Sequence, residues 1–374
     1  GLVAGILFIL PGFFVILVLS TLYAVYRDLN VVQAIFFGIK AAVLAVVIQA
    51  VFRIGKNILK NSAMIALAAF GFIGIFFFNI AFPIVVIIAG IIGYLGGQYR
   101  PDTFVIVQGH GSHGGEEVKQ AVVDAMIEAG QADHIRPSVA KAVRVTAICV
   151  LLWFAPIGTA MMLADPNSAF FDIGSFFSKM AVVTFGGAYA VLAYVAQEAV
   201  QSFGWLQPGE MLNGLGLAET TPGPLILVTE FVGYLAAYRN PGSLDAITAG
   251  TLGAMLTVWV TFVPCFLWIF LGAPYMEAAR ENTKLSAALS AVTAVVVGVI
   301  LNLAIWFGLH VLFAKVETQN IGPLRLFTPD LSSVDLEATG LALLALLAMF
   351  KLKWGMIQTL AVCSALGAIW HYMA

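Results

Sequence analysis

The strongest candidate for chemistry in this sequence is a run of polar and helix-breaking residues inside an apolar stretch. The run consists of Glu219, Thr220, Thr221, Pro222, Gly223 and Pro224. Neither proline has a backbone N–H to donate, so a helix must break here, and the glycine lets another group approach the backbone closely. A helix that restarts at Leu225 would point its amides and the positive end of its dipole into the break, which favours an anion, and the threonine hydroxyls add donors. The alternative to an anion site is a purely structural kink in a helix or a loop between two spans.

A carboxylate beside such a break is costly inside a membrane and is a functional candidate for that reason. We predict that Glu219 is the proton-coupling residue, although it could instead hold Thr220 and Thr221 in place. Glu210 and Glu230 flank the break on either side. We interpret each of these two as a structural or interfacial carboxylate and not as a proton carrier.

Two further features are candidates for the same substrate site. Gly186 and Gly187 interrupt another apolar stretch, where they either face the substrate or form a packing notch for a neighbouring helix. Lys40 lies in the middle of an expected span, where a lone lysine is costly unless it is paired or faces water. It attracts an anion, pairs with a carboxylate, or shows that the span boundary is misplaced.

Catalytic and metal-binding signatures are weak. His110 and His113 lie in a glycine-rich segment without cysteine or carboxylate partners at ligand spacing, so we predict no metal site. The sequence contains no phosphate-binding loop, dinucleotide fingerprint or nucleophile elbow. We therefore expect no enzyme activity and no cofactor.

The composition predicts an all-α, polytopic integral membrane protein. Hydrophobic residues make up 61% of the 374 residues, charged residues only 10%, and the mean hydropathy is +0.98. Soluble domains carry about 25% charged residues, so a lipid bilayer is the expected surrounding. The net charge of −2 gives no support for a nucleic-acid partner.

Apolar length predicts the spans. They cover Leu2–Tyr26, Val31–Phe52, Ala63–Phe78, Ile80–Gly97, Val145–Ala164, Phe171–Glu198, Glu210–Tyr238, Asp245–Ala273, Leu285–Ala314, Ala338–Phe350 and Trp354–Met373. The third and fourth spans, and the last two, are short, so each of these pairs is either two crossings or a tilted hairpin.

An internal repeat organises these spans. A shift of 253 residues lays Pro11 on Pro264, Arg27 on Arg280 and Gly55 on Gly308. We predict a membrane repeat over residues 1–97, a cytoplasmic linker over 98–144, and an extra span with the second repeat over 145–374. Basic residues at span ends place Arg27 outside and Arg280 inside, so the repeats are expected to be inverted, with broken helices at their interface. Both breaks lack a counterpart in the first repeat, so we expect a segment before Gly1.

The sequence around the breaks resembles the chromate transporter family. Phe185-Gly186-Gly187, Ala193 to Gln197, and Gly209 to Leu225 reproduce the pattern and spacing of that family's C-terminal half, and residues 1–97 resemble its N-terminal half. The resemblance implies the long, two-domain form. It also implies efflux of chromate across the bacterial inner (cytoplasmic) membrane, driven by the proton motive force, which confers chromate resistance.

Alternatives to this function remain open at the level of sequence. Sulfate is a tetrahedral dianion like chromate, so a transporter of sulfate or another oxyanion is one alternative. An anion channel or a membrane sensor is another. A homodimer is also left open as an assembly.

Overall fold

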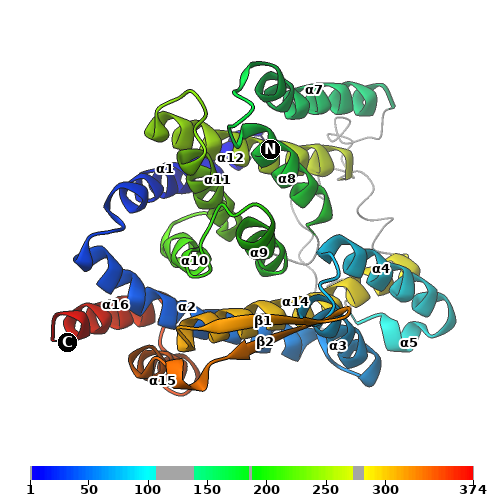
Figure 1. Cartoon of the computed structure of the whole chain (residues 1–374). Coiled ribbons are helices and arrows are strands. Elements are labelled where there is room, and N and C mark those ends of the chain that lie inside the picture. Colours follow the sequence, from blue (N-terminus) through cyan, green and yellow to red (C-terminus); the bar gives the residue numbers. More distant parts are fainter. Residues whose placement is uncertain (1, 107–138, 185–187, 273–281, 374) are drawn as a thin grey trace, which may run out of the picture.

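The computed structural model is predominantly helical, and it describes residues 2–106, 139–184, 188–272 and 282–373 (Figure 1). Its first helices are α1 (Leu2–Tyr26), α2 (Asn30–Ile58), α3 (Ser62–Phe76), α4 (Phe82–Tyr99) and the short α5 (Pro101–Phe104). Then follow α7 (Val139–Leu163), α8 (Phe170–Val183), α9 (Ala188–Gln197), the π-helical turn η2 (Glu198–Ser202), α10 (Glu210–Thr220), the 3-10 turn η3 (Leu225–Leu227) and α11 (Val228–Arg239). The last are α12 (Ala246–Gly272), α14 (Thr283–Leu312), η5 (Leu331–Ser333), α15 (Leu336–Phe350) and α16 (Met356–Met373).

Some sequence predictions fall outside the described residues. These are the glycine pair Gly186 and Gly187, the two histidines of the linker with most of that linker, and Arg280. The predictions for them are therefore carried forward unchanged.

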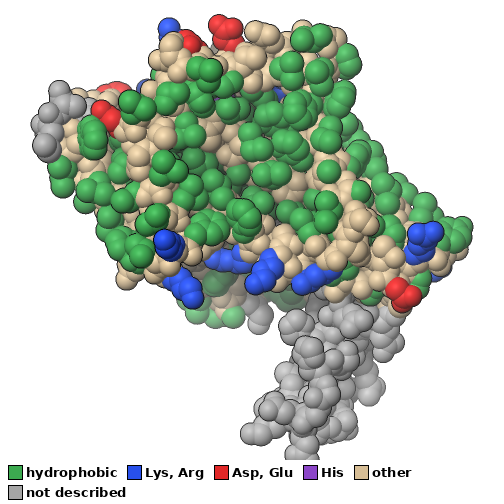
Figure 2. Space-filling model, turned by 90° about the horizontal axis from the view of Figure 1, so that it is seen from below, with side chains coloured by type: hydrophobic (Ala, Val, Ile, Leu, Met, Phe, Trp, Pro, Cys, Tyr) green, Lys and Arg blue, Asp and Glu red, His purple; other side chains and the backbone are tan. Residues whose placement is uncertain are grey.

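Several helices are long and apolar enough to cross a membrane. Among the described residues there are 6 of them: α1, α2, α4, Ala142–Met162 of α7, α12 and α14. Shorter apolar helices are α3, α15 and most of α16. One face of the molecule shows a broad hydrophobic surface, with a row of Lys and Arg side chains along one edge (Figure 2). This surface agrees with the predicted multi-pass architecture and with basic residues gathered on one side of the bilayer.

The long helices α2 and α14 pack against each other at the centre, and each carries the short helix pair of the other half. Helices α3 and α4 pack on α14, whereas α15 and α16 pack on α2 (Figure 1). Glycines allow the close approach: a Cβ placed on Gly71 would lie 2.8 Å from the Val295 carbonyl oxygen, and one on Gly38 would lie 2.0 Å from that of Cys363. The two halves are thus interleaved and share one core.

The predicted repeat register agrees with the helix boundaries. Adding 253 to the ends of α2, residues 30 and 58, gives 283 and 311, and α14 runs from Thr283 to Leu312. Helices α1 and α12 each contain an internal proline, Pro11 and Pro264. Equivalent positions of the two halves therefore form equivalent helices, while inversion of the repeats stays a prediction.

A small β-hairpin is the exception to the all-helical prediction. Strands β1 (Val316–Ile321) and β2 (Leu324–Pro329) pair antiparallel. Arg325 fixes the hairpin to the turn after α3, because its N–H donates to the Phe77 carbonyl at 2.6 Å and its guanidinium donates to Ile75 O at 3.1 Å. The same guanidinium reaches Gln201 of η2 at 3.0 Å. The hairpin therefore folds back beside α14 and links the end of α3 to η2.

Candidate anion site between two helical hairpins

The broken segment Glu210–Tyr238 is a re-entrant hairpin, and the prediction of a single crossing is wrong. Glu210 opens α10 and Arg239 closes α11, yet Arg239 donates to the Glu210 carboxylate through Nη2 at 2.6 Å and Nη1 at 2.8 Å. A straight helix would separate residues that far apart in sequence by about 43 Å. The chain therefore enters through α10, reverses at residues 221–224 and returns through α11. The Pro-Gly-Pro motif turns the chain as well as breaking the helix.

The segment Phe171–Glu198 also turns back, and its prediction as one crossing is likewise wrong. Phe176 of α8 and Tyr194 of α9 have ring centroids 5.4 Å apart, whereas a straight helix would place them about 27 Å apart. Trp205, beyond η2, contacts Phe176 as well, with ring centroids 5.8 Å apart. The reversal falls between Val183 and Ala188, where the sequence predicts the glycine break.

The tips of the two hairpins meet. Tyr189, the second residue of α9, donates its hydroxyl to the Glu219 carboxylate near the end of α10. Helix α9 also contacts the 3-10 turn η3, which follows the second break. The structure thus brings the two predicted breaks to one place, and the N-terminal end of the half-helix α9 lies beside Glu219.

A cavity of about 260 Å³ lies at this meeting point. Its polar lining comes from Gln49 and Arg53 of α2, Tyr189 of α9 and Glu219 of α10, and Trp354 before α16 closes one wall. Arg53 donates to the Gln49 side chain at 3.4 Å. A polar cavity of this size holds several water molecules, so an oxyanion with five heavy atoms fits beside the guanidinium.

The other residues of the Pro-Gly-Pro motif serve the turn itself. The hydroxyls of Thr220 and Thr221 both donate to the Leu217 carbonyl, at 2.9 and 2.7 Å, so they are not the free anion donors that the sequence predicts. Gly223 has φ +127, a conformation that favours glycine. What approaches its backbone is Gly12 of α1, because a Cβ on Gly12 would lie 2.7 Å from the Pro222 carbonyl oxygen. Helix α11 starts at Val228, one 3-10 turn later than predicted.

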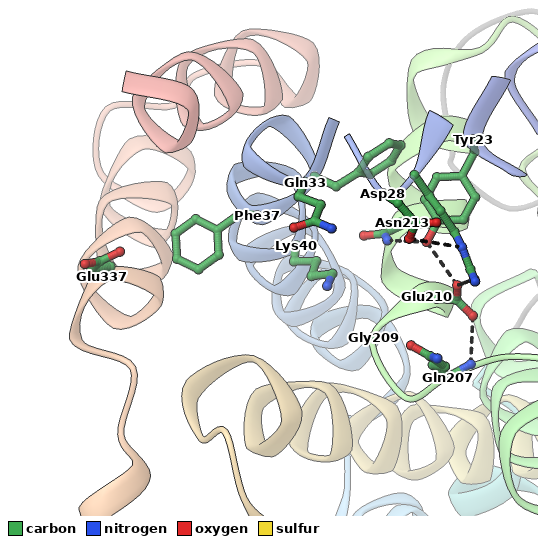
Figure 3. Close-up of a pocket in the computed structure, with 12 residues that line it drawn as sticks. Tyr23, Asp28, Gln33, Phe37, Lys40, Gln207, Gly209, Glu210, Asn213 and Glu337 are labelled. Carbon is green, nitrogen blue, oxygen red and sulfur yellow. Dashed lines mark hydrogen bonds and ion pairs between the residues drawn. The ribbon is translucent and has the colours of Figure 1, made fainter. Parts of the chain in front are cut away.

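Lys40 lies in a different cavity from Glu219. This second cavity, of about 460 Å³, is lined by Lys40 and Gln33 of α2, by Arg27 and by Glu210 (Figure 3). Lys40 extends toward Gly209, at the start of α10, and Nζ would lie 3.0 Å from a Cβ placed on that glycine. Glu219 is ten residues beyond Gly209, about 15 Å away along the axis of α10. The structure therefore separates the lysine from the break.

A buried ionic network closes the base of the second hairpin beside Lys40. Glu210 accepts from Arg27 and from the Tyr23 hydroxyl, each at 3.2 Å, and from the Gln207 N–H at 2.8 Å, in addition to Arg239. The Glu210 side chain is 7% exposed. The carboxylate thus joins α1, α10 and α11, which agrees with its interpretation as a structural residue.

Sequence reasoning missed Arg53, Tyr189 and the role of Arg239. Arg53 has the sequence pattern of a basic residue at the cytoplasmic end of a membrane span, and nothing in the neighbouring sequence links it to Glu219. Tyr189 does carry a signal, because it follows the glycine pair by two positions and so falls in the first turn after a break. Opposite charges at the two ends of the broken segment, Glu210 and Arg239, were the signal for a hairpin.

Half-helices whose tips meet at a polar cavity inside a multi-pass helical protein are an arrangement that recurs at the substrate sites of membrane transporters. The chain matches the family model described as chromate transporter over residues 1–94 and 171–368. It therefore belongs to the chromate transporter family and is a multi-pass membrane protein, which confirms the predicted resemblance and the polytopic helical fold. No solved structure matches the chain.

Three curated relatives are similar over most of the chain. The chromate transport protein of Pseudomonas aeruginosa is 30% identical over 80% of this chain and 62% of its own length. The probable chromate transport protein of Synechococcus elongatus is 25% identical (81% and 65%), and the chromate transport protein of Cupriavidus metallidurans is 23% identical (79% and 61%). The chain thus spans about three fifths of the length of these relatives.

Proposed function

We propose that this protein is a secondary transporter, not an enzyme, that exports chromate across the bacterial cytoplasmic membrane and confers chromate resistance. Family membership and the printed names of the three relatives support the substrate. The observation that carries the proposal is the cavity at which both hairpin tips meet, because it combines the N-terminal end of a half-helix with the guanidinium of Arg53.

The dianion binds between the tips in this proposal. Arg53 offers a planar pair of donors that suits two oxygens of a tetrahedral anion. Backbone amides at the start of α9, after Gly186 and Gly187, supply neutral donors, together with the N–H of Gly223 between the two prolines and the dipoles of the half-helices. Thr220 and Thr221 shape the turn. Lys40 lies in the second cavity, where it attracts the anion on its way to the site between the tips.

Glu219 is the proposed proton-coupling residue. It lines the same cavity as Arg53, so gain or loss of its proton changes by one unit the charge that a dianion meets. Its bond to Tyr189 joins the two hairpins. Protonation of Glu219 therefore changes both the charge that surrounds the substrate and the hydrogen bond that joins the tips.

The electrical part of the proton motive force is sufficient to drive export. Moving one charge across a membrane is worth about 2.3 kcal/mol per 100 mV, so a dianion gains about 4.6 kcal/mol when it leaves an interior that is negative by 100 mV. This corresponds to a concentration ratio of about a thousandfold.

Alternating access would rock one repeat against the other around this cavity. Lys284, near the start of α14, contacts Gln98 at the end of α4. Helix α2 runs antiparallel to α14, because Gly55 lies beside Val297 and Leu44 lies beside Gly308. Arg27, just before α2, therefore lies toward the other end of α14. Since α14 is about 45 Å long, Arg27 and Lys284 lie at opposite ends of the molecule, which supports inverted repeats.

Flux measurement in proteoliposomes tests the proposed function. A potassium diffusion potential and a pH gradient are imposed separately, and chromate movement is followed with and without excess sulfate. We expect chromate to move toward the positive side and to accumulate further when a pH gradient is added. Equal competition by sulfate would make the protein a general oxyanion transporter. Potential-driven current that an added pH gradient leaves unchanged would make it a channel, and binding without flux would make it a sensor.

A further inference from the structure

Glu230 is buried without any partner. It is the third residue of α11, none of its surface is exposed, and neither carboxylate oxygen has a hydrogen-bond partner within the described part of the chain. The two other carboxylates of this hairpin are bonded, since Glu210 accepts from two arginines and Glu219 from Tyr189. Glu230 therefore differs in kind from its neighbours.

Helix α12 carries, at the height of Glu230 along α11, a hydroxyl without a hydrogen-bond partner in the described part of the chain. Helices α11 and α12 are joined by residues 240–245 and run antiparallel with close contact, because a Cβ on Gly233 would lie 2.9 Å from that of Thr257. Glu230 lies one turn before Gly233, and Thr261 lies one turn beyond Thr257, so helical geometry places them side by side. The Thr261 hydroxyl is buried and has no partner among the described residues.

Helix α1 contributes a second such hydroxyl. Gly12 of α1 contacts Leu227, and the ring of Tyr23 lies 5.2 Å from that of Phe231. Ser20 lies between these two contacts, on the turn before Tyr23, and its buried hydroxyl also has no partner in the described chain. The two helices packed against α11 thus each carry a buried hydroxyl without a partner among the described residues, and neither hydroxyl is bonded to Glu230.

Among the described residues, no positive charge is paired with Glu230. The arginines nearest along the helices, Arg27 and Arg239, are both bonded to Glu210. The remaining titratable groups on the helices packed against α11 are Tyr23 and Tyr26 of α1, Glu210 and Glu219 of α10, Cys265 of α12, the exposed Asp172 and Lys179 of α8, and Tyr234 and Tyr238 of α11 itself. An ionised carboxylate that is buried without a partner is prohibitively costly, so the group is neutral instead.

We propose that Glu230 is a proton-binding site of the transporter, separate from Glu219, and not the structural or interfacial carboxylate that the sequence indicated. It holds a proton while α11 is docked between α1 and α12, and it releases the proton when the hairpin moves and exposes it. A proton needs no space of its own, and Glu230 lines neither the cavity that holds Arg53 and Glu219 nor the second cavity, which holds Lys40.

This site would link pH to the position of the hairpin. Glu230 lies directly after the turn that forms the anion site, and Gly12 of α1 packs against both that turn and Leu227. Docking requires the neutral carboxyl, so low pH favours the docked conformation, and ionisation at higher pH favours the conformation that exposes Glu230. The inference rests on the proposed transport function, because only a moving hairpin converts proton binding into coupling.

Infrared spectroscopy tests the protonated state without any transport. Wild type, Glu230→Gln and the control Glu317→Gln, which removes an exposed carboxylate of β1, are compared in detergent at neutral pH. We expect the carbonyl stretch of a buried, protonated carboxylic acid in wild type and in the control, and its loss in Glu230→Gln. Glu230→Gln should also unfold at the wild-type temperature, because glutamine resembles the neutral acid. A band that persists in Glu230→Gln would overturn the proposal.

Chromate flux distinguishes the proposed proton binding by Glu230 from the proposed transport function. Glu230→Gln should exchange chromate at equal pH close to the wild-type rate but lose the extra accumulation that a pH gradient gives. Full pH-driven accumulation in this variant would refute a coupling role, while wild-type flux would still support the transporter. A requirement for sodium in wild type that disappears in Glu230→Gln would also overturn the proposal, because the site would then bind a cation.

Discussion

Removing the Glu210 carboxylate should open the base of the second hairpin. In Glu210→Gln the charge that Arg239 and Arg27 share is lost, while the size of the side chain is kept. The Glu210 side chain is 7% exposed and that of Arg239 is 22% exposed. Breaking a buried ion pair by removing one partner costs about 3–5 kcal/mol. Because Arg239 is only partly buried, we expect a loss near the lower limit, about 3 kcal/mol.

The matched control removes the more exposed partner. Arg27 is 35% exposed, and its bond to Glu210 is 3.2 Å long compared with 2.6 Å for Arg239. Exposed pairs contribute about 0–1 kcal/mol, so Arg27→Met should cost less than about 1 kcal/mol.

Denaturant unfolding in mixed micelles measures both variants. The expected difference of about 2 kcal/mol corresponds to roughly a thirtyfold difference in the unfolding equilibrium constant. Equal stability of Glu210→Gln and Arg27→Met would refute the reasoning, because the bond that makes the segment re-entrant would then contribute nothing. The charge-reversed pair Glu210→Arg with Arg239→Glu should recover part of the loss.

Three further predictions concern transport and topology. Glu219→Gln should abolish chromate flux while the protein still inserts and elutes as wild type, and near-normal flux would remove Glu219 from the mechanism. Cysteines at Asn30 and Asn282 should react with an impermeant reagent from opposite sides of the membrane, whereas labelling from one side would mean parallel repeats. Gly223→Val should weaken chromate binding more than Lys40→Met, because valine cannot adopt φ +127 without strain; the reverse order would place the anion at the lysine.

The sequence predicted where the helices break but not that the chain turns back. Proline lacks the N–H of a helical hydrogen bond and glycine destabilises a helix. Helix α10 ends at Thr220, just before Pro222, as expected, whereas the glycine pair lies outside the described residues. The direction after a break depends on tertiary contacts such as Glu210 with Arg239. Length did contain the information: α10 has 11 residues and α11 has 12, about 17 Å each, which is half of the roughly 30 Å bilayer core.

The partners within the site could not be predicted from local sequence. Arg53 and Glu219 lie far apart along the chain, and a basic residue near a span end has an ordinary explanation in the inside location of positive charges. Lys40 stood out because a charge in mid-span is rare, yet the helix carries it to a different cavity from the break. The repeat register was predictable because matched prolines and glycines fall at equivalent places in α1 and α12 and in α2 and α14.

The most direct test of whether the anion site lies between the hairpin tips is chromate binding to the purified protein. The measurement compares the variants Arg53→Gln and Lys40→Met. Titration calorimetry in detergent gives the affinity of each variant without any dependence on coupling or orientation. We expect Arg53→Gln to lose chromate binding, because the guanidinium is the positive side chain in the cavity with Glu219, and Lys40→Met to retain it. Binding that survives Arg53→Gln and disappears in Lys40→Met would place the substrate in the second cavity, beside Lys40, and contradict the proposed site.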